Sequence, residues 1–378
     1  MQLRLTPCLA LLAAPSVHGF LLPNLTGPYS VGTVSLELID YKRNDNFAPV
    51  PQPRDLMVSV FYPTSSSDNF TLAPDCSPKV ASFLDTLYGL PEGLAESFSS
   101  QAYENAPVRR TERPMPVVLF SPGFGALRQG YTALVSDVAS HGYLVIAVDH
   151  PFDSSIIEYP DGRTVLANLT MQPWDFPGGI DGALYMRVAD LQFVLDSLSN
   201  ETITQQIPGL KSARIQRDRV CSFGHSFGGA ASIQVMKNDT RFRCGINMDG
   251  GLYGSVVTEG TDRPAMIMAS SVHPAGSIES WPAFWEHANG YKRFMRINGT
   301  THGSFLDFAA VLDAVGPLVP PEFRSSFGTI GGARMLDIES AYSTAFFGKF
   351  LKGGRCSGRL LDGDNVKYPE VTFDNSNP

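Results

Sequence analysis

The stretch from Val220 to Ala230 constrains the fold of this chain more than any other part of it. An apolar strand pattern runs through the turn Gly-His-Ser-Phe-Gly (224–228) into a helical pattern of small residues. Many enzymes present a nucleophilic serine on such a tight, strained turn between a strand and a helix. Five residues alone can match by chance, but this context predicts that Ser226 is a nucleophile.

Size and composition predict one large globular domain over residues 20–378. The 378 residues are 43% hydrophobic and 17% charged, so a sizeable core can be buried. The net charge of −8 disfavours nucleic acid, whose phosphates attract clustered Lys and Arg. No Cys-x-x-Cys or His-x-His cluster occurs in the sequence, so we expect no metal and no cofactor.

Residues 1–19 have the layout of a cleaved secretory signal. Arg4 precedes the apolar run 9–14, and small residues follow up to Gly19. The run is too short for a membrane span, which needs about 20 apolar residues. Export is also indicated by Asn-x-Thr acceptors for N-glycosylation, at Asn24, Asn69, Asn168, Asn200, Asn238 and Asn298. We therefore expect a secreted, extracellular glycoprotein.

Cysteines remain at positions 76, 221, 244 and 356 after this signal. In an oxidising compartment they allow two disulfides, with three possible connectivities. Cys221 and Cys244 lie on predicted apolar strands, so they are alternatively a pair of neighbouring buried thiols.

Extended apolar runs predict the strands of one sheet, at residues 31–38, 56–63, 116–123, 143–150, 219–224, 244–250, 265–270 and 293–299. Helical patterns at 131–142, at 185–200 and after the serine favour parallel strands with helices on both faces. The first two runs have no helix between them and should form an antiparallel edge. This is the α/β-hydrolase layout, a doubly wound and mostly parallel eight-stranded sheet.

Two insertions interrupt the pattern, at residues 64–112 and 151–184. Loops at the C-terminal ends of parallel strands build pockets. We assign the second insertion, with Trp174, to the wall of a substrate pocket, and a surface decoration is the alternative. Phe305, after the candidate histidine, is a second candidate for the pocket.

A serine nucleophile needs an imidazole as base, and the imidazole needs a carboxylate to orient it. In this fold the chain order is serine, acid, histidine, so the candidate bases are His273, His287 and His302. His302 follows the last predicted strand, at the edge where the serine is presented. His287 lies in a helical pattern and His273 ends the preceding strand, so we predict His302 as the base.

The acid is expected one strand earlier than usual. The run 265–270 ends without a carboxylate, whereas Asp249 lies at the tip of the run 244–250, beside two glycines. Asp262 and Glu279 are the alternative acids. The alternative for Asp249 itself is a purely structural role, in which it only starts a turn before the two glycines.

Backbone N–H groups should stabilise the charge that develops on the acyl oxygen. We expect one from Phe227, at the start of the helix, and one from Phe124, in the glycine-containing loop 121–125. His225 is expected to be structural.

Several segments together resemble the platelet-activating-factor acetylhydrolase family, in its secreted α/β-hydrolase branch. They are FSPGFGALRQGYTALVSDVASHGYLVIAVDH, RVADLQFVLDSL, GHSFGG, NMDG and THGSFLDF. Carried over by position, the resemblance implies the nucleophile Ser226, the acid Asp249 and the base His302. It also implies the amides of Phe124 and Phe227 as oxyanion donors.

The resemblance implies hydrolysis, without calcium, of short or oxidised acyl groups at the second glycerol carbon of phospholipids. Pro122, where the family more often has histidine, departs from its pattern and bears on the pocket walls. Two rival functions stay open: hydrolysis of small soluble esters, lactones or cutin-like polymers, and a hydrolase-fold binding protein without turnover. The apolar stretches 80–90 and 305–315 are either buried helices or a reversible contact with a lipid surface.

Overall fold

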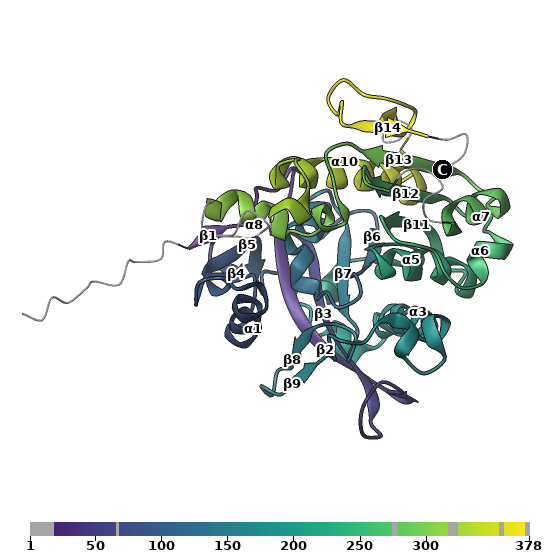
Figure 1. Cartoon of the computed structure of the whole chain (residues 1–378). Helices are drawn as coiled ribbons and strands as arrows, with labels where there is room; N and C mark the ends of the chain where they lie inside the picture. Colours follow the sequence, from purple (N-terminus) through teal and green to yellow (C-terminus); the bar gives the residue numbers. More distant parts are fainter. Residues whose placement is uncertain (1–18, 66–67, 274–278, 317–323, 355–358, 375–378) are drawn as a thin grey trace, which may run out of the picture.

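The computed structural model describes residues 19–65, 68–273, 279–316, 324–354 and 359–374 (Figure 1). The predicted signal, apart from Gly19, lies outside these residues. The strands are β1 (Phe20–Leu21), β2 (Ser30–Asn44), β3 (Pro53–Thr64), β4 (Leu72–Pro74), β5 (Phe98–Glu104), β6 (Met115–Ser121), β7 (Leu144–Asp149), β8 (Ile156–Glu158), β9 (Thr164–Leu166), β10 (Ile215–His225), β11 (Phe242–Met248), β12 (Ala265–Ser270), β13 (Lys292–Ile297) and β14 (Val371–Phe373).

In the described part of the chain, the main sheet has the order β1-β5-β2-β3-β7-β6-β10-β11-β12-β13-β14, with β4 beside β5. Every predicted run is a strand of this sheet, and neighbours from β7 to β13 pair parallel. The predicted α/β-hydrolase fold is therefore confirmed, but the sheet has more than the predicted eight strands, because β1, β4, β5 and β14 extend it at its edges. The predicted antiparallel pair β2–β3 also forms, but it is not the edge, because β5 pairs with the outer side of β2.

The helices are α1 (Pro78–Tyr88), α2 (Thr132–Ser140), α3 (Gly179–Ser197), α4 (Glu201–Thr204), α5 (Phe227–Asn238), α6 (Ser255–Glu259), α7 (Ser280–His287), α8 (Phe308–Val315) and α10 (Gly332–Leu351). Short 3₁₀ helices are η1 (Ala95–Ser97), η2 (Arg128–Tyr131), η3 (Pro173–Asp175), η4 (Leu210–Ser212), η5 (His302–Phe305), η7 (Ser325–Phe327) and η8 (Arg359–Leu361). Among the described residues, no helix is both long and apolar enough to cross a membrane.

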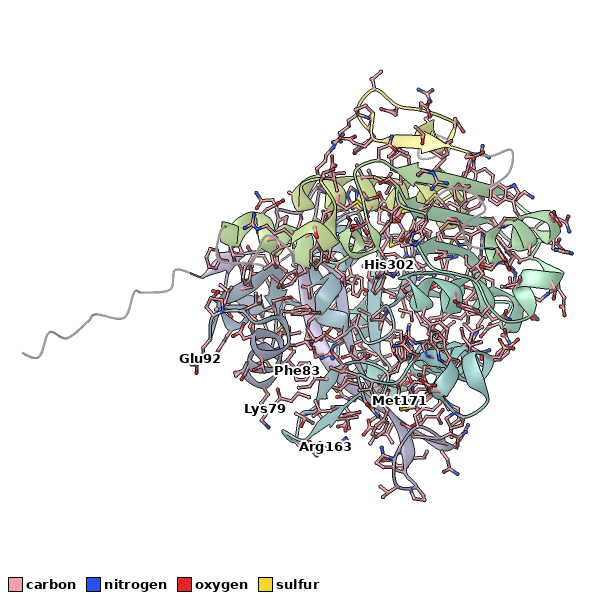
Figure 2. All side chains as sticks on the ribbon, viewed as in Figure 1. Lys79, Phe83, Glu92, Arg163, Met171 and His302 are labelled. Carbon is pink, nitrogen blue, oxygen red and sulfur yellow. A yellow bond between two sulfur atoms is a disulfide. The ribbon has the colours of Figure 1, made fainter. Side chains whose placement is uncertain are left out.

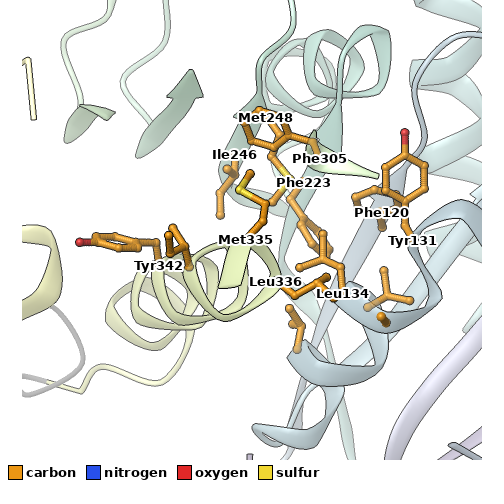
Figure 3. Close-up of a cluster of buried hydrophobic side chains, with 14 of the residues drawn as sticks. Phe120, Tyr131, Leu134, Phe223, Ile246, Met248, Phe305, Met335, Leu336 and Tyr342 are labelled. Carbon is orange, nitrogen blue, oxygen red and sulfur yellow. The ribbon is translucent and has the colours of Figure 1, made fainter. Parts of the chain in front are cut away.

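Helices cover both faces of the sheet because its strands are apolar on both faces. In β6, Val118 and Phe120 pack into the core under α2, α8 and α10, whereas Val117 and Leu119 pack into the core under α3, α5 and α7. Figure 3 shows part of the first core, where sheet residues such as Phe223 and Met248 face Met335 of α10 and Phe120 packs beside Tyr131. Alternate side chains of a strand point to opposite faces, so one continuous apolar run fills both cores.

The two insertions form different parts of the fold. Residues 64–112 form β4, α1, η1 and β5, which widen the sheet at the β1 edge (Figure 1). Residues 151–184 form a separate two-stranded sheet, β8–β9, then η3 and the start of α3.

Cys221 and Cys244 are opposite each other on β10 and β11, with Cα atoms 4.7 Å apart, and form a disulfide. The disulfide alternative therefore holds for this pair. Cys76 is buried and is a free thiol in the described part of the chain, and position 356 lies outside that part.

Candidate active site

Ser226 lies on a strained turn between β10 and α5. Its backbone φ of 55° and ψ of −125° lie in a region that non-glycine residues rarely adopt. The turn closes only because the residues two positions before and after Ser226 are glycines. A Cβ atom on Gly228 would lie 2.0 Å from the carbonyl oxygen of Ser121, and one on Gly224 would lie 2.5 Å from Gly228. The small residues of the motif therefore hold Ser226 above the carboxyl end of the sheet.

Asp249 and His302 meet at the same edge of the sheet. Asp249 directly follows β11 and is 1% exposed, and His302 begins η5 after β13. His302 Nδ1 is 2.8 Å from Asp249 Oδ2, and the other carboxylate oxygen accepts the N–H of Ser270 at 2.8 Å. Because the carboxylate accepts the Nδ1 proton, His302 Nε2 is the basic nitrogen. Ser226 and His302 both line one pocket, so the predicted nucleophile, acid and base come together.

The alternative acids and bases lie elsewhere, with one exception. Asp262 and Glu279 are exposed, and His287 is an exposed residue of α7 whose Nδ1 donates to the carbonyl of Ala283 at 2.7 Å. The exception is His273, which sequence analysis considered only as a base.

The Nδ1 atom of His273 is 3.1 Å from the Asp249 carboxylate and 2.8 Å from Ser270 Oγ. Asp249 thus has two imidazole neighbours. The position of His273 directly beyond β12, where this fold usually has its acid, was the only signal for this contact in the sequence.

His225 lines the same pocket and is connected through Tyr131 to the loop 121–125, which carries the Phe124 amide and is called the oxyanion loop below. The Tyr131 hydroxyl accepts the N–H of Gly123 at 3.1 Å and forms a second hydrogen bond, 2.8 Å long, with His225 Nδ1. Burial lowers the pKa of His225 well below its ordinary value, and the nearby His302 lowers it further. The ring of Phe305 stacks on His225 with a centroid distance of 5.6 Å. Phe305, expected to line the pocket, is not among the lining residues and packs against His225 instead.

The two predicted oxyanion donors lie beside Ser226. Phe227 is the first residue of α5, and within the described part of the chain neither its N–H nor that of Phe124 donates a hydrogen bond. A Cβ atom on Gly123 would lie 3.4 Å from Ser226 Cβ, so the loop is in contact with the serine. Both amides are thus free to bind an oxyanion.

The pocket in front of Ser226 has a volume of about 260 Å³. Its apolar walls come from α1 and the residues after it, from the oxyanion loop and from the region of α8, and include Leu84, Tyr88, Leu90, Leu94, Phe98, Leu127, Leu306, Phe308 and Val311. The insertion 64–112 therefore contributes to the wall. The insertion 151–184, which we predicted to form the pocket wall, contributes no lining residue, so that prediction is wrong. Trp174 is 63% exposed and is not a lining residue.

Figure 2 labels His302 near the middle of the molecule, with Phe83 and Lys79 of α1 to one side. Among the described residues, no three His, Cys, Asp or Glu side chains lie close enough together to hold a metal ion.

This fold, with a serine elbow and a histidine–aspartate pair at one sheet edge, defines an α/β hydrolase. The chain belongs to the platelet-activating factor acetylhydrolase, isoform II, family, whose model matches residues 15–167 and 191–354. Similarity to known esterases extends over nearly the whole chain, and the protein is a carboxylic ester hydrolase.

The chain is 30% identical over 391 residues to a probable 1-alkyl-2-acetylglycerophosphocholine esterase of Arthroderma benhamiae, with 96% of each chain covered. It is 28% identical over 375 residues to the platelet-activating factor acetylhydrolase of Bos taurus, covering 90% of this chain and 80% of that protein. Among solved structures, it resembles a ferulic acid esterase from Streptomyces cinnamoneus. That match has a TM-score of 0.80 and 31% identity, and covers 94% of this chain and 99% of that one.

Proposed function

We propose that the protein hydrolyses short acyl esters, in particular the sn-2 acetyl or other short acyl group of a phospholipid, through an acyl-enzyme on Ser226. The observation that carries this proposal is the hydrogen bond between His302 and Asp249 beside Ser226, at the mouth of one apolar pocket. The similarity to relatives named as acetyl-phospholipid esterases supports the substrate class.

The proposed reaction has two halves. Ser226 Oγ attacks the ester carbonyl carbon and its proton passes to His302 Nε2, while Asp249 stabilises the imidazolium. The amides of Phe124 and Phe227 bind the oxyanion, and the alcohol leaves with the proton from His302. A water molecule, deprotonated by His302, then attacks the acyl carbon and releases the acid and Ser226.

The size of the pocket supports a short acyl group. Its 260 Å³ is below the range of about 300–1,000 Å³ that is typical of sites enclosing a whole drug-sized ligand. The acyl group of the ester is therefore expected inside, with the alkyl chain and head group of a phospholipid outside.

Hydrolysis of aromatic esters is the second candidate. Its support is the 31% identity to the Streptomyces cinnamoneus ferulic acid esterase, together with the aromatic rings of Tyr88, Phe98 and Phe308 on the pocket wall. Aromatic rings pack favourably against an aromatic acyl group.

Secretion and glycosylation are part of the proposal. The basis is the signal-like sequence 1–19 and the exposure of the six acceptor asparagines, at positions 24, 69, 168, 200, 238 and 298. Contact with a lipid surface is proposed for α1, where Leu87 is 41% exposed. The apolar side chains of α8 pack largely into the core, so we do not assign a lipid contact to that helix.

A substrate panel tests the function. The panel contains a short-acyl phospholipid, a long-acyl phospholipid, p-nitrophenyl butyrate, a lactone and methyl ferulate, with Ser226→Ala as control. We expect the highest kcat/KM on the short-acyl phospholipid, and labelling of the wild type alone by a fluorophosphonate. A preference for methyl ferulate would favour the second candidate, and absence of labelling would contradict an acyl-enzyme.

A further inference from the structure

We propose that Arg187 is a positioning residue of the oxyanion hole. It holds the loop that carries the Phe124 amide, and it contacts the ring of Phe227. This inference rests on the proposed function, because it assigns a role in the same ester hydrolysis.

Arg187 lies on α3, and its side chain is 0% exposed. Nε and Nη2 donate to the two carboxylate oxygens of Asp153 at 2.6 and 2.5 Å. Nη1 donates to the carbonyl of Pro122 at 2.5 Å, and Nη2 donates to the carbonyl of Gly123 at 3.2 Å. These two carbonyls belong to the residues directly before Phe124, so one guanidinium fixes the approach to the oxyanion donor.

The ion pair also fixes the residue after Phe124. The N–H of Gly125, a glycine with a φ of 72°, donates to the backbone carbonyl of Asp153 at 3.2 Å. The guanidinium carbon of Arg187 lies 5.0 Å from the ring centroid of Phe227. Both residues that offer an amide to the oxyanion are therefore held by the same buried pair.

A second buried layer supports this arrangement. The Nε2 atom of His150 is 2.9 Å from Ser121 Oγ, and its Nδ1 atom is 2.8 Å from the Asp190 carboxylate. Burial and the Arg187 guanidinium lower the pKa of His150, so the neutral ring donates to Asp190 and accepts the Ser121 hydroxyl. The Ser121 oxygen then accepts Nη1 of Arg187 at 3.3 Å. Ser121, His150 and Asp190 are 0% exposed and do not line the pocket, so this set is a scaffold.

Lysine cannot replace the arginine in this role. A guanidinium has five donors in a rigid plane, whereas an ammonium is a compact charge on a flexible chain. Arg187→Lys keeps the charge beside Asp153 but cannot hold Asp153 and both loop carbonyls in one plane. The oxyanion charge develops only in the transition state, so a displaced Phe124 amide should lower kcat and leave KM nearly unchanged.

The test compares Arg187→Lys with Arg263→Lys. Arg263 also holds backbone carbonyls, those of Met236, Asp239 and Phe242 at 2.6–2.8 Å, but it is not a pocket residue. For each variant we measure kcat and KM on p-nitrophenyl butyrate, and the inhibition constant of a trifluoromethyl ketone whose hemiketal oxyanion occupies the hole. Circular dichroism checks the fold.

For Arg187→Lys we expect kcat and the ketone affinity to fall together by about 100-fold, because that is the usual cost of losing one oxyanion donor. Arg263→Lys should change both less than threefold. If Arg187→Lys does not fold, the double variant Arg187→Met/Asp153→Asn removes both charges and is measured in the same way. A rise in KM alone, or unchanged kcat and ketone affinity, would overturn the inference. Failure of the proposed function shows instead in the wild type, as absence of hydrolysis of every ester in the panel.

Discussion

Replacing Gly228 by alanine should cost far more activity than stability. Gly228 lies where α5 crosses the end of β6, and a Cβ there would lie 2.0 Å from the carbonyl oxygen of Ser121 and 2.4 Å from that of Pro122. Ordinary contacts begin at 3.4 Å, so the helix and the oxyanion loop must separate by about 1.4 Å, the difference between 3.4 and 2.0 Å.

The size of each effect follows from this separation. A displacement of about 1 Å in a catalytic arrangement costs about 100-fold in rate, so kcat/KM should fall at least 100-fold. Overpacking costs about 1–3 kcal/mol, and the better helix propensity of alanine offsets about 1 kcal/mol of that. The free energy of unfolding should therefore fall by no more than about 2 kcal/mol, leaving the variant folded.

The assay pairs kcat/KM on p-nitrophenyl butyrate with urea unfolding. Gly363→Ala is the matched control, because a Cβ at that position meets no atom within 4 Å and its φ is not positive. Wild-type kcat/KM in Gly228→Ala would refute the argument that this glycine sets the distance between the elbow and the oxyanion loop.

Two further predictions concern the base and a buried acid. His302→Ala should lower kcat by at least about 10⁴-fold while the fold persists, because the base is lost. His287→Ala, at an exposed position, is the control and should leave kcat unchanged. Steady-state kinetics measure both variants, and a loss of less than tenfold in His302→Ala would contradict the base assignment. Burial raises the pKa of Glu339 well above its ordinary value, and Asp307 raises it further. An acid whose pKa is raised in the folded state stabilises the fold when the pH is below its pKa in the unfolded state, near 4.5. That stabilisation is lost as the pH rises through the pKa of the folded state. As pH rises above the unfolded pKa, Glu339→Gln should therefore gain unfolding free energy relative to the wild type, by less than about 1.4 kcal/mol per pH unit. A difference in urea unfolding that stays constant with pH would contradict this prediction.

Local patterns predicted much of the fold and the meeting of Ser226, Asp249 and His302 at one edge of the sheet. The apolar runs identified the strands of the sheet's central region, because a strand buried on both faces is apolar at successive positions. The glycines around Ser226 and Asp249, and the position of His302 after a strand, placed these side chains at strand ends. Parallel strands bring such ends to one edge, so the sequence alone indicated that the three residues meet.

What surrounds these residues was decided only by the tertiary structure. The insertion 64–112 reaches the pocket because β5 pairs beside β2, and nothing in its own sequence specifies that neighbour. His273 contacts Asp249, and Arg187 holds the oxyanion loop, across separations of 24 and 64 or 65 residues. The spacing of apolar residues indicates which face of a helix or strand is buried. Which other element packs on that face depends on the order of the strands in the sheet. The sequence by itself therefore determined which residues lie at the sheet edge, and only packing determined the pocket walls and the supports of the oxyanion hole.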